Sequence, residues 1–156
     1  MQKPIKKVAI SRAKIGGESP IIIGEITDKC LYSGFFGTLD SARTQVITEK
    51  VLDLLGKTGI EIVVLDLSNV DIVDSAVTVH LVKFANTLKL VGVDIIFCGI
   101  TPIVAQTMIT AGVELKGYRI SRDLKSAIKE VFLRQGLMLV PFSPSSAEQA
   151  QQQQQQ

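Results

Sequence analysis

Two short strand-like segments, at residues 61–67 and 94–98, constrain the fold of this chain most strongly. The first contains the uninterrupted apolar run IVVL, and in the second the apolar run IIFC follows an aspartate. A strand that is apolar on both faces belongs inside a parallel sheet that helices cover on both sides. Each segment is followed by apolar residues at helical spacing, so right-handed crossovers would make the two strands parallel. If they are neighbours, the loops that follow them, near Ser75 and near Thr101, lie side by side where open α/β sheets place their sites.

The other segments predict a hairpin first and then an alternation of helices and strands. Residues 20–27 and 29–36 are rich in branched or aromatic side chains, and the Thr27-Asp28-Lys29 corner fits a hairpin turn. Helical spacing and capping residues predict helices between Asp40 and Gly56, from about Ser75 to Val91, between Thr101 and Gly112, and through Leu124 to Phe132. A short strand is expected near residues 118–120. We therefore predict an α/β protein: a mixed sheet with an N-terminal hairpin, parallel inner strands and about four packing helices.

The domain organisation follows from the length and from the composition of the two ends. A chain of 156 residues has the size of one compact domain, which we place at residues 19–140. Residues 1–18 are basic and predict an N-terminal arm or an edge strand. Residues 141–156 are rich in Ser, Pro and Gln and hold too few apolar side chains to offset their ordering entropy, which predicts a disordered tail. Without a secretory signal or an apolar run of membrane-helix length, a cytoplasmic protein is expected.

The charge and the side-chain inventory exclude several kinds of site. A net charge of +2 gives no electrostatic reason to expect a nucleic-acid partner. The single histidine, His80, excludes any site that needs two imidazoles. Cys30 and Cys98 match no metal-ligand spacing and are predicted to be reduced thiols in the core. We expect no bound metal and no cofactor.

The stretch LDLSNVDIVDS, residues 65–75, places polar side chains between a buried strand and a helix. In one interpretation Asp74 or Ser75 only caps the helix, and the other polar residues line a loop. In a second, Asp66, Asp71 and Asp74 bind Mg²⁺ in a small phosphoryl-handling enzyme or phosphocarrier. Both interpretations are compatible with the spacing of these residues.

Two further interpretations concern the Ser75 hydroxyl. As the nucleophile of a hydrolase it would need a base, but His80 lies more than one helical turn away on a different face. As a regulatory phosphoacceptor it stands where the unpaired amides and the dipole of a helix N-terminus favour added negative charge. A phosphate beside Asp74 would repel an acidic partner surface, so phosphorylation there can switch an interface without unfolding the domain.

Two strings in the sequence resemble the STAS domain (sulfate transporter and anti-sigma factor antagonist), most closely its stressosome scaffold and co-antagonist branch. The first is D-x-S-x-V-x-x-x-D-S at residues 66–75, and the second is G-I-x-P-x-x-A-Q-T at residues 99–107. They occur in order, and the resemblance runs from about residue 19 to residue 135. The family implies a mixed sheet packed by helices, which is the architecture that the residue pattern predicts.

The resemblance implies roles for individual residues. Ser75 matches the residue that a partner serine kinase phosphorylates in antagonist proteins, and Asp74 matches the acidic residue before it. Thr107 matches a second phosphoacceptor of the stressosome branch, although its place on an apolar helix stripe equally fits a hydroxyl at the edge of the core. We assign Asp74, Thr78 and Thr101 to a partner interface.

The function implied is that of a non-catalytic anti-sigma factor antagonist or stressosome scaffold in a partner-switching pathway. Its partners would be a serine/threonine protein kinase of the anti-sigma type, a PP2C-type phosphatase and other STAS proteins in a homo- or hetero-oligomer, without nucleic acid or membrane. The chain departs from the co-antagonists, which usually carry an N-terminal sensor domain, because only about 18 residues precede its first predicted strand. A purely structural oligomer, in which Ser75 is only a cap, and the Mg²⁺-dependent enzyme remain as alternatives.

Overall fold

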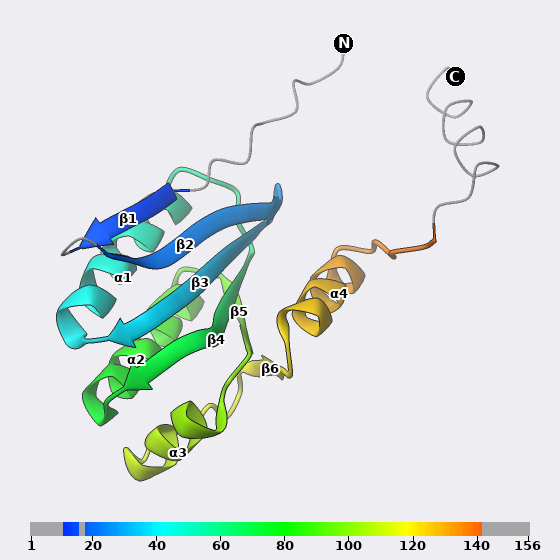
Figure 1. Cartoon of the computed structure of the whole chain (residues 1–156). Coiled ribbons are helices and arrows are strands. Elements are labelled where there is room, and N and C mark those ends of the chain that lie inside the picture. The colour runs from blue at the N-terminus through cyan, green and yellow to red at the C-terminus, as the bar shows by residue number, and fades with distance from the viewer. Residues whose placement is uncertain (1–10, 16–17, 142–156) are drawn as a thin grey trace, which may run out of the picture.

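The computed structural model describes residues 11–15 and 18–141 of the chain. These residues form one six-stranded sheet, in the order β1-β2-β3-β4-β5-β6, and four helices (Figure 1). The strands are β1 (Ser11–Ile15), β2 (Glu18–Thr27), β3 (Cys30–Leu39), β4 (Ile62–Val73), β5 (Asp94–Cys98) and β6 (Arg119–Ser121). The helices are α1 (Ser41–Leu55), α2 (Ser75–Leu90), α3 (Pro102–Thr110) and α4 (Leu124–Arg134).

The sheet is mixed, as the sequence predicted. β1, β2 and β3 are antiparallel to one another, whereas β3, β4, β5 and β6 are parallel. The predicted hairpin is formed by β2 and β3, with Asp28 and Lys29 in the turn. β4 and β5 are parallel neighbours, and Asp66 lies opposite Cys98 at the end of β5. The predicted α/β class and the parallel inner strands are confirmed.

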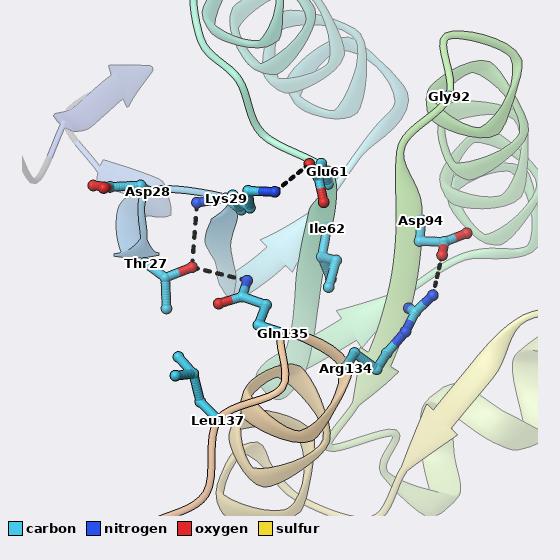
Figure 2. Close-up of a pocket in the computed structure, with 10 residues that line it drawn as sticks. All are labelled: Thr27, Asp28, Lys29, Glu61, Ile62, Gly92, Asp94, Arg134, Gln135 and Leu137. Atoms are coloured by element: carbon cyan, nitrogen blue, oxygen red, sulfur yellow. Dashed lines mark hydrogen bonds and ion pairs between the residues drawn. The ribbon is translucent and has the colours of Figure 1, made fainter.

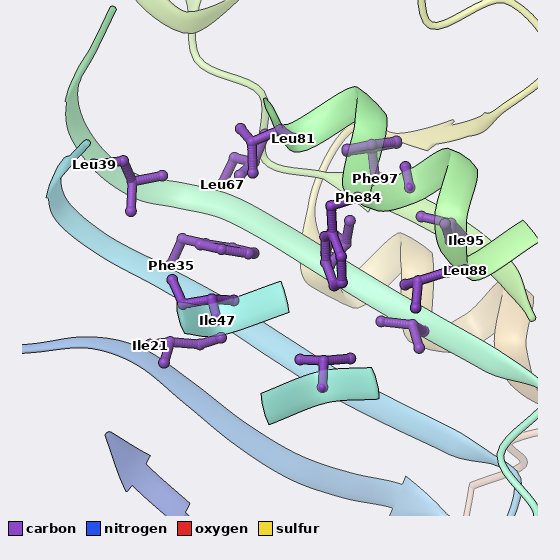
Figure 3. Packing of buried hydrophobic residues seen from close by; sticks show 14 of the residues in the cluster. Ile21, Phe35, Leu39, Ile47, Leu67, Leu81, Phe84, Leu88, Ile95 and Phe97 are labelled. Carbon is purple, nitrogen blue, oxygen red and sulfur yellow. The ribbon is translucent and has the colours of Figure 1, made fainter. Parts of the chain in front are cut away.

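Alternate residues of the central strands face two separate apolar cores. Val63 and Leu65 of β4 belong to the larger core, which also holds buried residues of α1, α2 and α3. Figure 3 shows part of this core, where Phe35 of β3 lies near Ile47 of α1 and Phe84 of α2. Val64 belongs to a smaller core on the other face, which α4 covers through Ala127 and Val131. β4 is therefore buried on both faces, which explains why its apolar run is uninterrupted.

Each helix begins after a residue whose side-chain oxygen accepts a backbone amide of the first turn. In α1 the Arg43 amide donates to Asp40 at 2.8 Å, and in α2 the Val77 amide donates to Asp74 at 2.7 Å. In α3 the Val104 amide donates to Thr101 at 3.3 Å, and in α4 the Ser126 amide donates to Asp123 at 2.8 Å. Gly92 follows α2 with a φ of 84°, a left-handed conformation that costs glycine little. Local capping signals thus place the helix boundaries where the sequence predicted them.

β4 extends further than the sequence predicted. Residues 68–73, which were expected to line a loop, continue to pair with β3, whereas β5 ends opposite Asp66. From Gly34, opposite Asp66, to Leu39, opposite Val73, β3 advances five residues. At 3.3 Å per residue, α2 therefore starts roughly 17 Å beyond the end of β5. The loops that lead to Ser75 and Thr101 leave the sheet at different levels, which corrects the expectation that they lie side by side.

Two β-bulges account for this extension. β4 has one residue more than β3 between Asp66 and Asn69, and one more after Val70. Each bulge inverts the alternation of side chains, so Leu67, Val70 and Val73 all reach the larger core although they stand three residues apart. A spacing of three is not the period of a regular strand, and for that reason the sequence pattern suggested a loop.

β1 pairs with β2 and forms one edge of the described sheet at residues 11–15. The remainder of the predicted N-terminal arm, residues 1–10, and the predicted tail from residue 142 onward lie outside the described residues. The domain boundaries therefore stay predictions. Within the described ranges, no helix is both long and apolar enough to span a bilayer.

We predict that truncating Leu88 destabilises the domain and that truncating Leu90 does not. Both residues lie on α2, but Leu88 is 0% exposed in the larger core and Leu90 is 87% exposed. Leu88→Ala should lower the free energy of unfolding by about 2–5 kcal/mol, and Leu90→Ala should change it by less than about 0.5 kcal/mol. Urea denaturation measures both values, and equal losses in the two variants would contradict this packing.

Candidate functional site

The Ser75 side chain is exposed at the first residue of α2. Its carbonyl oxygen accepts the Thr78 hydroxyl at 2.8 Å, which fixes the backbone of the first turn. Its own hydroxyl has no hydrogen-bond partner among the described residues. The hydroxyl is therefore accessible to an enzyme or a partner surface.

Asp74 and Thr78 build the turn that presents Ser75. Asp74 is exposed, and its Oδ1 accepts the Val77 amide at 2.7 Å. Thr78 is fully buried, so its side chain is not available for the partner contact that we assigned to it from the sequence. Thr78 instead stabilises the turn from inside, because its hydroxyl satisfies the Ser75 carbonyl.

Three aspartates, Asp40, Asp71 and Asp74, lie near the paired ends of β3 and β4. Asp71 and Asp74 are exposed, and neither forms an ion pair with another described residue. Asp40, the cap of α1, pairs with Arg43 at 3.3 Å. Because Asp74 directly precedes Ser75, a phosphate on Ser75 would add a charge of about −1.5 to −2 beside an existing carboxylate.

The second predicted phosphoacceptor, Thr107, lies on α3, which packs beside α2 and β4 (Figure 1). Thr107 is half-buried, and its hydroxyl donates to the Ile103 carbonyl at 3.0 Å. α3 has no charged residue, and it exposes Ile103 and Ile109 by 65% and 72%. Thr107 is thus part of an uncharged, partly apolar surface, at whose start Thr101 is half-buried as the helix cap.

A polar cluster that the sequence analysis did not predict lies on the sheet face that α4 covers. Asp66 is only 4% exposed, and its Oδ2 accepts the Tyr32 hydroxyl at 3.0 Å. Its Oδ1 accepts the Ser68 amide at 2.9 Å and also the Ser68 hydroxyl. Burial raises the pKa of Tyr32, and the Asp66 carboxylate adds to this increase. Tyr32 and Asp66 are 34 positions apart, so the only sequence signal was a carboxylate inside an apolar run.

The three aspartates of the Mg²⁺ interpretation do not converge. Asp66 is buried and hydrogen-bonded within the sheet, whereas Asp71 and Asp74 are exposed at the end of β4. In the part of the chain that the structure describes, no group of three or more His, Cys, Asp or Glu side chains could hold a metal ion. The geometry therefore gives the Mg²⁺-dependent alternative no support.

Cys30 and Cys98 are free thiols in the smaller core, as the sequence predicted. Burial raises the pKa of each thiol to about 12, and the Asp66 carboxylate contributes to the increase at Cys98. Both thiols are therefore neutral at physiological pH, which favours a packing role over a reactive one.

A pocket of about 740 Å³ lies at the opposite end of the sheet, where β4 and β5 begin (Figure 2). Three pairs of its lining side chains bond to one another: Lys29 with Glu61, Arg134 with Asp94, and Gln135 with Thr27. The pocket is a gap between the end of α4 and the β2–β3 hairpin. It is remote from Ser75, which lies beyond the other end of β4.

Several known proteins are similar to this chain over more than half of its length. The RsbT co-antagonist protein RsbRA of Bacillus subtilis (strain 168) is 30% identical over 93 residues, which cover 60% of this chain and 34% of RsbRA. A variant of RsbS from Moorella thermoacetica has a TM-score of 0.65 at 24% identity, with 76% of this chain and 100% of the RsbS chain covered. The anti-sigma factor antagonist SpoIIAA in its unphosphorylated form has a TM-score of 0.62 at 17% identity, with coverages of 76% and 99%.

These matches agree on one domain. This chain spans about a third of the length of RsbRA, and it covers nearly the whole of the two solved structures. The model of the STAS domain family matches residues 24–127, a range that includes both sequence strings, Ser75 and Thr107. This chain therefore belongs to the STAS domain family.

Proposed function

We propose that this chain is a non-catalytic anti-sigma factor antagonist or stressosome scaffold that is controlled by phosphorylation of Ser75. Unphosphorylated, it binds a serine/threonine protein kinase of the anti-sigma type, and phosphorylation releases that kinase. The observation that carries the proposal is the exposed hydroxyl of Ser75 at the start of α2, which no described residue engages. The name of RsbRA, an RsbT co-antagonist, supports a role in the same kind of pathway.

The start of α2 can accept a phosphate without unfolding. Asp74 caps the Val77 amide and Thr78 satisfies the Ser75 carbonyl, and neither contact uses the Ser75 hydroxyl. The free amides and the dipole of a helix N-terminus stabilise a phosphate. Its charge, added to those of Asp71 and Asp74, changes the surface that a bound partner meets while the fold stays intact.

Thr107 is the second phosphoacceptor in this proposal. A phosphate there would be the first charge on α3, beside the exposed Ile103. Phosphorylation would remove the hydrogen bond from the Thr107 hydroxyl to the Ile103 carbonyl. The cost is small, because a carbonyl inside a helix also accepts a backbone amide. Asp74 and Thr101 are the other residues of the proposed partner surface; they cap α2 and α3, which pack against each other although they leave the sheet at different levels.

Further partners follow from the family rather than from a site on this chain. A PP2C-type phosphatase resets the switch by removing the phosphate, and other STAS proteins assemble with this chain into a homo- or hetero-oligomer. Both belong to a cytoplasmic pathway. Because the chain spans about a third of RsbRA, we assign it only the activity of the STAS part of such an assembly.

Ser75→Ala should keep the kinase bound, and Ser75→Asp should release it. The expected loss in the aspartate variant is about a hundredfold in affinity, roughly 3 kcal/mol, which one interfacial charge can supply. A pull-down followed by titration with a serine kinase of the anti-sigma type encoded beside this chain measures the effect.

Ser41→Asp is the matched control for this experiment. α1 and α2 both begin with Asp-Ser-Ala, in which Asp40 and Asp74 are the caps, so Ser41 has the same helical position as Ser75. Leu39 and Val73 are paired, so Ser41 lies near Ser75 at the same edge of the sheet, and Ser41→Asp adds the same charge to the neighbouring helix. If the contact requires the charge at Ser75 itself, Ser41→Asp should cost much less affinity than Ser75→Asp. Equal binding by both Ser75 variants, or an equal loss in Ser41→Asp, would contradict the proposal.

Phosphopeptide mapping should find phosphate on Ser75 and Thr107 after incubation of the protein with that kinase and ATP. Ser41 and Thr110 are internal controls, because Ser41 shares the Asp-Ser-Ala sequence and Thr110 shares α3. Mass spectrometry of the digested protein distinguishes the four sites. A map with phosphate on Ser41 or Thr110 and none on Ser75 would refute the assignment.

A further inference from the structure

The buried carboxylate of Asp66 lies at the point where the sheet narrows. β5 ends at Cys98, opposite Asp66, and beyond this point β4 has only β3 as a neighbour. The β3–β4 pair then continues alone to Val73, one residue before Asp74. The direction in which this two-stranded extension leaves the sheet determines where Asp74 and Ser75 are placed.

Asp66 holds the first bulge of β4 in place. The bulge lies between Asp66 and Asn69, where one residue of β4 has no counterpart on β3. The Ser68 amide, inside this bulge, donates to Asp66 Oδ1 at 2.9 Å, and the Ser68 hydroxyl donates to the same oxygen. The carboxylate thus satisfies an amide that the irregular pairing takes out of the ladder.

The other oxygen of Asp66 ties the bulge to β3. Asp66 Oδ2 accepts the Tyr32 hydroxyl at 3.0 Å, and Tyr32 lies on β3 before the pairing of Gly34 with Asp66. A Cβ atom on Gly34 would overlap the Tyr32 hydroxyl, so glycine leaves the space that this hydroxyl occupies. The carboxylate is therefore fixed from both strands of the extension.

The end of β5 lies against the Asp66 carboxylate and the Ser68 side chain. Gly99 follows β5 with a φ of 65°, and a Cβ atom there would lie 2.8 Å from Asp66 Oδ1 and would overlap the Ser68 side chain. A side chain at this position would therefore displace the hydrogen-bonded groups. Three strands thus approach the Asp66 carboxylate so closely that it has little freedom to move.

We propose that Asp66 is a positioning residue for Ser75: it fixes the first bulge of β4, and through that bulge the direction in which β4 delivers the phosphoacceptor. The bulge inverts the side-chain alternation so that Val70 and Val73 reach the larger core with Leu67. Without the carboxylate, the Ser68 amide and the Tyr32 hydroxyl lose their partner, and the extension is free to change register. This inference rests on the proposed function only in naming Ser75 as the residue that is presented.

Asp66→Ala, Asp66→Asn and Val64→Ala test the proposal together. Asparagine keeps an oxygen that can accept the Ser68 amide, so Asp66→Asn should restore most of what Asp66→Ala loses. Val64→Ala is the matched control, because Val64 is fully buried on the same strand and the same face, two residues earlier, and packs only in the smaller core. It removes packing beside Tyr32, with which Val64 is paired, but keeps the Asp66 carboxylate and the groups that donate to it.

Amide hydrogen exchange, followed residue by residue by NMR, is the first readout. Asp66→Ala should speed exchange at residues 67–75 at least about tenfold more than at β5, because an unsatisfied amide favours local opening. Val64→Ala should speed exchange evenly over β4 and β5. Identical exchange patterns in Asp66→Ala and Val64→Ala would overturn the proposal, as would unchanged exchange at residues 67–75 in Asp66→Ala.

The rate of Ser75 phosphorylation by the anti-sigma-type kinase is the second readout. Asp66→Ala should lower kcat/KM at Ser75 at least about tenfold, with Asp66→Asn and Val64→Ala close to the unmodified protein. Equal rates in Asp66→Ala and the unmodified protein would overturn the positioning role. If the unmodified protein is not phosphorylated at Ser75 at all, the proposed function fails, while the exchange measurement still decides the role of Asp66.

Discussion

The burial of β4 on both faces is the constraint on which the rest of this structure depends. Val63 and Leu65 pack under α1, α2 and α3, and Val64 packs under α4, so this strand joins the two helical layers. The same strand then continues past the end of β5 and carries Asp74 and Ser75 away from the centre of the sheet. β4 thus combines a base that is buried on both faces with an extended end, and the exposed side chain of Ser75 lies just beyond that end.

Most of the fold could be predicted from the sequence because its signals are local. The hairpin turn at Asp28, the caps at Asp40 and Thr101 and the apolar run of β4 each involve neighbouring residues, and each was confirmed. The extension of β4 could not be predicted, because two bulges convert a spacing of three into a buried face. Such irregularities depend on the partner strand, and a single sequence does not reveal it.

The candidate site was predictable in position but not in environment. The strings of the STAS family made Ser75 and Thr107 the candidate phosphoacceptors, whereas the burial of Thr78 and the bond between Tyr32 and Asp66 appear only in three dimensions. The Asp-Ser-Ala sequence occurs twice at helix starts, after the paired ends of β3 and β4, and Ser75 is exposed whereas Ser41 is half-buried. Accessibility and neighbouring charge, rather than local sequence, distinguish the two serines.

Titration calorimetry with the phosphorylated protein measures what a phosphate on Ser75 does to kinase binding. The kinase should be titrated with two preparations of the full chain, one unmodified and one carrying a single phosphate on Ser75. We expect the two affinities to differ by about a hundredfold, with unchanged circular dichroism in the two preparations. Equal affinities, or a loss of binding that coincides with unfolding, would contradict this expectation.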